Sequence, residues 1–252
     1  GTINLRDTGG GNIGISMNTF TFQGTDPYTI STATGTTGSF ELDGASKTLT
    51  TAAAAGNPEH TISVTVSFNT VGGSTGTTDI GSGTTLKLED AVFSSGITLN
   101  KTSAGTLILD PPSTTIAGGS YFPDTFNINE GTVNISSSLQ NVPSSTITNN
   151  GTLQFSPSSG TLTVAGNIGG SGTLVKTGAS TVVLTGTNNY SGGTTISGGT
   201  VQASAANNLG TGDISLNGGT LSATDGFTFT EGVSVGGDII ISANGGATLT
   251  LS

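Results

Sequence analysis

Few residues in this chain could act as catalytic groups. The single histidine, His60, follows Glu59 and precedes a strongly alternating segment. A Ser–His–Asp hydrolase would have to use this histidine as its general base. Residues 72–76 match the G-x-S-x-G turn, which presents a nucleophilic serine ahead of a helix, but no helical pattern follows them. We therefore interpret His60 as a surface residue where a strand begins, and residues 72–76 as a flexible turn.

Paired acids and clustered cations are the other groups that could cleave a polysaccharide. Glu89 and Asp90 are neighbours in the sequence, so on a strand their carboxylates point to opposite faces. A polysaccharide-active enzyme, a remote alternative, would need a cationic base or clamp beside clustered acids. The five cationic residues are spread widely: Arg6, Lys47, Lys87, Lys101 and Lys176. We therefore predict that the protein is not an enzyme and has no catalytic residues.

Metal ligands are equally scarce. The chain has no cysteine, which excludes disulfides and thiolate metal sites. Calcium requires six or more oxygen ligands, usually from several carboxylates in a recognisable loop, and no such loop occurs. Asp110, Asp124 and Glu130 lie in or beside a proline-containing insertion, and we interpret them as solvated loop charges. We predict no metal site and no cofactor.

The charge balance limits the partners. Five Lys and Arg against fifteen Asp and Glu give a net charge of −10. A protein that binds nucleic acid needs several cationic side chains to neutralise the phosphates, and binding to an anionic membrane surface requires cationic side chains as well. No apolar run approaches the length of a membrane-spanning helix. We therefore expect no nucleic acid among the partners and no membrane insertion of this segment.

The elements that position these residues are strands. Gly, Thr, Ser and Asn make up more than half of the 252 residues, and only 8% are charged, which argues against a helical protein. Apolar residues recur with a period of two, as in Ile62, Val64, Val66 and Phe68. That period indicates a strand with one buried face. In the segment from Thr181 we expect Val183 to point inward.

A repeat with a period of about 20 residues indicates how the strands are arranged. The pattern at Glu130–Val133 returns at Asn150–Leu153, and the pattern at Gly198–Val201 returns at Gly218–Leu221. A right-handed parallel β-helix, or β-solenoid, has a period of this length, and each coil buries its inner face on its neighbours. The chain would form roughly 11 coils, or rungs, at about 22 residues each. The alternative is a β-sandwich or jelly roll, which has no reason to repeat internally.

One of these repeats resembles a known family. Residues 172–201 read GTLVKTGASTVVLTGTNNYSGGTTISGGTV and are similar to the passenger-associated transport repeat, or autotransporter-associated β-strand repeat, of bacterial autotransporter passenger domains. Ser180 replaces a glycine of the family pattern. A degenerate copy begins at Leu99, keeps Lys101 and Leu109, and then departs through Pro111. Lys101 and Lys176 occupy equivalent positions, and we interpret them as structural.

The resemblance implies a right-handed β-helix that is secreted and displayed on the outer surface of a Gram-negative bacterium. It implies a scaffold that aids export and folding, without catalysis or a particular ligand. We expect a single solenoid over residues 1–252. Its parts are divergent N-terminal coils at 1–82, a degenerate repeat with an insertion at 83–157, a clear repeat at 158–225, and C-terminal coils at 226–252.

Two functions follow from this architecture. The first is a non-catalytic extracellular stalk or adhesin scaffold whose partners are glycans or proteins of the host or cell surface. The second is a fibre subunit whose copies join end to end through open β-helix ends. The residues that would carry this assembly are Ile3, Leu5, Leu249 and Leu251.

Aromatic residues outside the core are the candidates for binding. Tyr121 and Phe122 lie in the insertion of the degenerate repeat, between Gly119 and Pro123. Tyr28 and Tyr190 are the other aromatics expected outside the core. Exposed rings on a loop could stack on a sugar or a protein partner. In the alternative interpretation, Phe122 folds back to cover the solenoid.

Overall fold

The computed structural model describes residues 2–5, 13–17, 19–23, 26–32, 38–42, 47–52, 58–63, 65–68, 75–112, 120–137, 141–142, 144–229, 231–243 and 249–251. The chain divides into two compact units, Gly1–Val133 and Asn134–Ser252, and each is described by itself. The single solenoid over residues 1–252 stays a prediction. Among the described residues, no helix combines the length and hydropathy needed to cross a bilayer.

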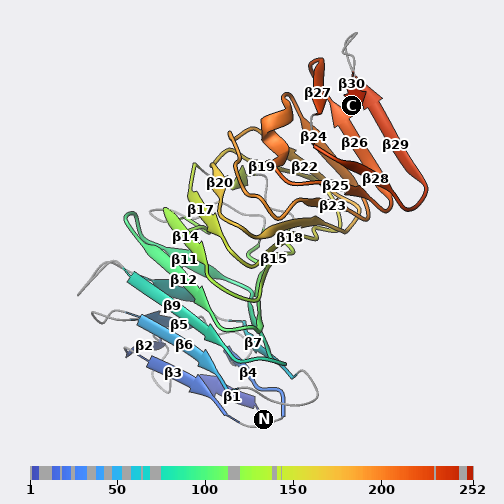
Figure 1. Ribbon diagram of the computed structural model, residues 1–252. Coiled ribbons are helices and arrows are strands. Elements are labelled where there is room, and N and C mark those ends of the chain that lie inside the picture. The colour runs from blue at the N-terminus through green and yellow to red at the C-terminus, as the bar shows by residue number, and fades with distance from the viewer. Residues whose placement is uncertain are drawn as a thin grey trace. The chain divides into compact units, whose positions relative to one another are not determined.

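The first unit is a stack of short parallel strands (Figure 1). They are β1 (Thr2–Leu5), β2 (Ile13–Met17), β3 (Thr19–Phe22), β4 (Thr29–Thr32), β5 (Gly38–Leu42), β6 (Lys47–Thr51), β7 (Glu59–Ile62), β8 (Thr65–Phe68), β9 (Thr75–Ile80), β10 (Thr85–Leu88), β11 (Ala91–Phe93), β12 (Thr98–Thr102), β13 (Thr106–Leu109) and β14 (Thr125–Ile128). Three sheets result, in the orders β1-β4-β7-β10-β13, β2-β5-β8-β11 and β3-β6-β9-β12-β14. From β1 to β13 every third strand pairs, as a coil with three sides requires, whereas β14 pairs with β12 because the coil that begins at β13 has only two described strands.

The second unit repeats this arrangement. The strand β15 (Thr132–Ile135) crosses the boundary. The others are β16 (Asn141–Val142), β17 (Thr146–Asn149), β18 (Thr152–Phe155), β19 (Thr161–Val164), β20 (Ile168–Gly169), β21 (Thr173–Lys176), β22 (Thr181–Leu184), β23 (Thr194–Ile196), β24 (Thr200–Ala203), β25 (Ile214–Leu216), β26 (Gly219–Ala223), β27 (Phe227–Phe229), β28 (Val233–Val235), β29 (Ile239–Ala243) and β30 (Leu249–Leu251), with a 3₁₀ turn η1 (Ala206–Leu209). The orders are β18-β21-β23-β25-β28, β16-β19-β22-β24-β26-β29, β17-β20 and β27-β30.

The fold class is confirmed, with a correction to the number of coils. Consecutive coils pair in parallel, for example Leu153 with Leu174 in β18 and β21, whereas a sandwich or jelly roll is antiparallel. Eight coils contain all three strands: β1–β3, β4–β6, β7–β9, β10–β12, β15–β17, β18–β20, β25–β27 and β28–β30. The predicted count of roughly 11 is too high for complete coils, because those that begin at β13, β21 and β23 each lack a strand among the described residues.

Buried asparagines connect the coils where the third strand is missing. The Asn188 side chain accepts a hydrogen bond from the Ile168 backbone N–H (2.8 Å) and donates one to the backbone carbonyl of Asn208. The Asn208 amide donates in turn to the Gly186 carbonyl (2.9 Å). Buried backbone N–H and C=O groups need hydrogen-bond partners. Here side-chain amides provide the partners that a neighbouring strand would otherwise provide.

The alternation within strands decides which side chains form the core. In β22, Val182 and Leu184 are completely buried, whereas Thr181 and Val183 are half-buried on the outer face. The expectation that Val183 points inward is therefore wrong. Full burial of a Val or Leu side chain contributes about 1.5–3 kcal/mol, so the inner columns of stacked apolar residues are the main source of stability.

Candidate functional site

The clear repeat forms a turn around a buried lysine. Lys176 is the last residue of β21 and its side chain is fully buried. Its Nζ donates to the Thr177 carbonyl and to the Gly178 carbonyl (2.9 Å) within its own turn. It also donates to the Gly198 carbonyl (3.3 Å), in the equivalent turn of the next coil. One ammonium group therefore ties two successive turns together.

The degenerate repeat contains the same lysine turn. Lys101, in β12, is also fully buried. Its Nζ donates to the carbonyls of Thr102 (3.0 Å), Ser103 (2.6 Å) and Glu130 (3.2 Å). Again two acceptors lie in the turn that follows the lysine and the third lies one coil further on. These contacts agree with the structural role predicted for Lys101 and Lys176.

The two lysines keep their charge at neutral pH. Burial lowers the pKa of each to about 8, because the interior disfavours the charged form. That value still leaves the ammonium dominant at pH 7, and its three N–H donors match the three carbonyl acceptors. A cation held inside the fold by backbone carbonyls is a clamp between coils.

Backbone geometry limits which residues fit these turns. Gly199 has a φ of +64°, and a Cβ there would collide with the Gly178 and Ser180 carbonyl oxygens. Ser103 and Gly178 occupy equivalent positions, both with a φ of 62°. The serine hydroxyl donates to Asp79 Oδ1 (2.5 Å), and this bond compensates for a conformation that usually favours glycine. The degenerate copy therefore keeps the turn without its glycine.

A cluster of aromatic side chains lies in the N-terminal coils. The rings of Phe22 and His60 are stacked, with centroids 4.8 Å apart and planes 4° apart. The Phe22 ring also contacts Phe20 edge-on (5.0 Å) and Tyr28 (6.1 Å). The Tyr28 backbone N–H donates to His60 Nδ1 (3.2 Å). His60 is only 1% exposed, so the expectation of a surface histidine is wrong.

The buried histidine predicts a loss of stability in acid. Burial lowers the pKa of His60 from 6.5, so the unfolded chain binds a proton more readily than the folded chain below that pH. The free energy of unfolding should therefore be constant near neutral pH and fall below pH 6.5. Protonation would also place a hydrogen on Nδ1, which accepts the Tyr28 N–H. Urea unfolding measured between about pH 7.5 and 5 checks this prediction.

A His60→Asn variant is the control for this prediction. The amide oxygen can accept the Tyr28 N–H but does not titrate in this range. The variant should lose the part of the pH dependence that the wild type shows just below pH 6.5. Identical pH profiles for the two proteins would show that His60 does not couple folding to protons.

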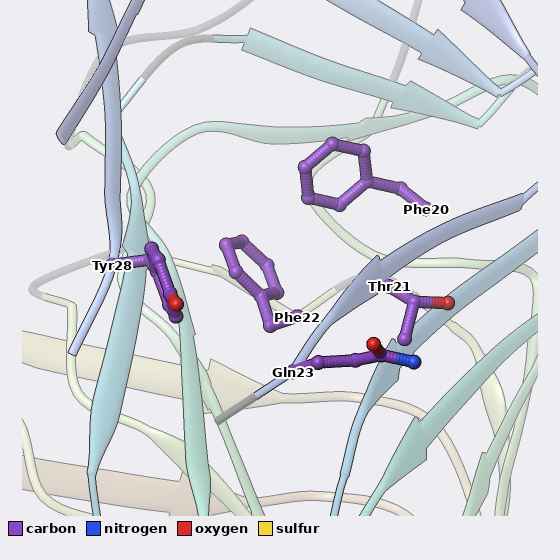
Figure 2. A pocket seen from close by; sticks show the side chains of 5 residues that line it. All are labelled: Phe20, Thr21, Phe22, Gln23 and Tyr28. Carbon is purple, nitrogen blue, oxygen red and sulfur yellow. The ribbon is translucent and has the colours of Figure 1, made fainter. Parts of the chain in front are cut away.

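An open hollow lies against this aromatic cluster. It has a volume of about 220 Å³ and is lined by Phe20, Thr21, Phe22, Gln23 and Tyr28. Figure 2 shows that Phe20 and Phe22 project from one side of β3 while Thr21 and Gln23 project from the other. Thr21 and Gln23 are exposed and Phe22 is buried. The sequence contained a signal for part of this cluster, because Phe20 and Phe22 alternate shortly before Tyr28. His60 is distant in the sequence, and it reaches the cluster because the next coil stacks on this one.

The other predicted aromatics are buried. Phe122 is 1% exposed and Tyr121 is 9% exposed, so the position of Phe122 agrees with the interpretation in which it covers the solenoid. Their role in ligand binding stays an untested prediction. Tyr190, expected outside the core, is completely buried. Its hydroxyl donates to Thr194 Oγ1 (2.6 Å), since the Thr194 hydroxyl itself donates to the Leu209 carbonyl (2.9 Å). Burial also raises the pKa of Tyr190.

The acidic residues of the insertion have separate partners. Asp110 forms an ion pair with Lys87 (2.9 Å), which also pairs with Glu89 (3.1 Å). Asp124 accepts the Gly96 backbone N–H (2.5 Å), and Glu130 contributes its backbone carbonyl to the Lys101 turn. No group of three potential metal ligands occurs in the described part of the chain.

The residues predicted to join copies end to end lie in the outermost described strands. Ile3 and Leu5 belong to β1, and Leu249 and Leu251 belong to β30. Their side chains lie outside the part of the structure that is described, so their contribution to assembly stays a prediction.

Comparison with known proteins supports the interpretation of the repeat. The passenger-associated transport repeat matches residues 99–135 and 174–203, which together make up somewhat more than a quarter of the chain. These segments contain both lysine turns. Searches of curated proteins and of solved structures returned no match. The repeat and the solenoid fit a passenger-like scaffold, a secreted or surface-displayed type of protein. The chain is therefore a β-solenoid protein that carries two passenger-associated transport repeats.

Proposed function

We propose that this chain is a non-catalytic part of an autotransporter passenger that acts as a stalk or adhesin scaffold on the surface of a Gram-negative bacterium. The observation that carries the proposal is the position of the repeats. Both lysine turns lie inside the solenoid and join one coil to the next, so the repeats build the scaffold itself.

The lysine turns also suit folding during export. In a solenoid, each coil contacts mainly its neighbours, so folding can propagate coil by coil. Lys176 donates to the Gly198 carbonyl of the next coil, so whichever of the two coils folds first presents one partner of this bond to the coil that is added. A chain that emerges gradually from a membrane can fold in this order. We propose host or cell-surface glycans and proteins as the partners of the displayed scaffold.

Labelling of intact cells tests the display. Bacteria that produce the full-length protein are incubated with an antibody against residues 134–252, before and after proteinase K treatment. We expect surface signal that the protease removes, while a periplasmic protein stays unlabelled. Signal that appears only after the outer membrane is permeabilised would contradict the proposal.

A second candidate function is self-assembly, which three exposed apolar side chains favour. Val235 is 59% exposed and Ile241 is 38% exposed, yet they pair in register with the buried residues Leu216 and Leu221. They therefore continue inward columns without being covered. Ile240 is exposed as well, at 62%. A second copy stacked in the same register would bury Val235 and Ile241.

Sedimentation and negative-stain electron microscopy over a concentration series test this assembly. Filaments or oligomers are expected to grow with concentration. A Val235→Glu/Ile241→Glu variant should remain dispersed, because stacking would bury two carboxylates. Single particles of the unmodified protein at every concentration would exclude self-assembly.

A further inference from the structure

The outer face of one sheet in the first unit carries a regular array of short polar side chains. The sheet has the order β3-β6-β9-β12-β14, and Figure 1 shows these strands side by side. Buried side chains alternate with half-buried or exposed ones along each strand, so every second residue points outward. The register aligns the outward residues in three columns that run from coil to coil.

Threonine occupies most positions in these columns. The three columns contain, in turn, Thr75, Thr98 and Thr125; Thr48, Thr77, Asn100 and Asn127; and Thr21, Thr50, Asp79 and Thr102. The exceptions, two asparagines and one aspartate, are also short and polar. No aromatic ring and no lysine, arginine or glutamate occupies a described outward position of these strands. We call this surface the threonine face.

Strand pairing fixes the repeat distances of the threonine face. Neighbours in a column lie on adjacent strands about 4.8 Å apart, and alternate residues along one strand lie about 6.7 Å apart. The paired residues advance one by one along both strands, so the two repeats define a rectangular lattice. Oxygen atoms on the prism surface of hexagonal ice repeat at closely similar distances in two perpendicular directions. Several hydroxyl groups of the face can therefore occupy oxygen positions of the ice lattice at once.

The side chains of the threonine face are held in place before any ligand binds. Threonine is branched at Cβ, which restricts its χ1 rotamers. The Asn127 amide donates to Asn100 Oδ1 (2.8 Å), and the Thr102 hydroxyl donates to Asp79 Oδ1 (3.1 Å). Asp79 also accepts the Ser103 hydroxyl, so donors of the next coil surround its charge. Little side-chain entropy therefore opposes binding to a rigid partner.

The composition of the face indicates which rigid surface it fits. Aromatic rings stack on the sugars of a polysaccharide surface, and the described outward positions have none. An ionic mineral surface requires an array of charges, whereas Asp79 is the single charged residue among these positions. Ice is neutral and presents donors and acceptors in a fixed lattice. Each threonine hydroxyl can both donate and accept, which matches that surface.

We propose that the threonine face of β3, β6, β9, β12 and β14 binds the surface of an ice crystal. This inference goes beyond the stalk or adhesin function and does not rest on it, because adsorption to ice is a property of the purified protein. On a displayed scaffold, the same face would hold a cell against ice.

Slow freezing of a protein solution tests the proposal. The purified chain and serum albumin, labelled with different dyes, are frozen together on a cooled probe, and both are measured in the ice and in the remaining liquid. We expect the chain to be enriched in the ice relative to albumin. Thr77→Tyr should abolish this enrichment, because Thr77 lies between Thr48 and Asn100 in the middle column. A bulky ring there would keep the ice surface away from the neighbouring side chains.

Thr61→Tyr is the matched control. Thr61 is half-buried on the outer face of β7, in another sheet of the same unit, and it undergoes the same chemical change. This variant should be enriched in ice as strongly as the wild type. Tyrosine favours strands, so both variants should fold, and cooperative thermal unfolding close to the wild-type temperature verifies this.

The partitioning of these proteins can overturn the proposal in two ways. The first is a folded wild-type chain that partitions like albumin, and retention of that chain on crystalline cellulose would then assign the face to a polysaccharide. The second is an enrichment that Thr77→Tyr keeps, or that both variants lose equally, since the threonine face would then not be the surface that contacts ice.

Discussion

A Val182→Asp substitution is expected to unfold the central coils of the second unit. Val182 is completely buried and stacks between Leu162 and Val201 in the register of β19, β22 and β24. An aspartate there would place an unpaired carboxylate in an apolar column, a penalty of several kcal/mol. Since domains are stable by only about 5–15 kcal/mol, a loss above about 4 kcal/mol removes a large part of this stability and brings a domain at the lower end of the range close to its unfolding midpoint.

The adjacent residue provides a matched control. Val183→Asp makes the same chemical change one position further on, where the side chain is on the outer face beside Thr163 and Gln202. Its carboxylate stays hydrated, and we expect a loss within about 1 kcal/mol, which reflects β-propensity. Circular dichroism during thermal and urea unfolding measures both variants. Equal losses in the two variants, or a larger loss for Val183→Asp, would show that the register of β22 is wrong.

This pair illustrates how far the sequence determines the fold. The alternation of apolar residues predicted strands, and the longer repeat predicted coils, because both patterns follow from local geometry. The segment Thr181–Leu184 has three consecutive apolar residues. Hydropathy alone therefore does not determine the phase of the alternation, that is, which of these side chains face the core. The stacking partners in neighbouring coils decide that phase, and they contribute only after the chain has folded.

The aromatic site was harder to predict because the coils of the first unit vary in length. The strands β1, β4 and β7 begin at unequal intervals along the chain, whereas β18, β21 and β23 begin at equal intervals. Without a fixed period, the sequence does not indicate that His60 packs on Phe22. The chemistry of each residue was visible, but its neighbours depended on coil lengths that no sequence pattern reveals.

The buried lysines show a different limit. Their equivalent positions in the two repeats were visible in the sequence and predicted a structural role. Lysine is nevertheless almost never fully buried unless its ammonium group is paired, so residue type alone does not predict their burial. That burial depends on a third carbonyl from the following coil, Glu130 for Lys101 and Gly198 for Lys176. This acceptor lies a full coil further along the chain, beyond the reach of local patterns.

Lys176→Met is expected to destabilise the second unit by about 3 kcal/mol, because it removes three charge-assisted hydrogen bonds while their acceptors stay buried. Methionine keeps the apolar stem and fills similar space, so the loss reports on the ammonium group rather than on a cavity. The carbonyls of Thr177, Gly178 and Gly198 would be left without their donor. The free energy of unfolding in urea at pH 7, where the lysine is protonated, measures the effect.

Lys87→Met is the matched control for this substitution. The Lys87 side chain is 24% exposed, and its Nζ pairs with Glu89 and Asp110 at the surface. Surface ion pairs of this kind contribute about 0–1 kcal/mol, so we expect a small change. The difference between the stability losses of Lys176→Met and Lys87→Met distinguishes a buried lysine that holds two coils together from a lysine in an ordinary surface ion pair. If Lys176→Met were as mild as Lys87→Met, the carbonyl contacts would not stabilise the coil, and the repeat would need another explanation for its lysine.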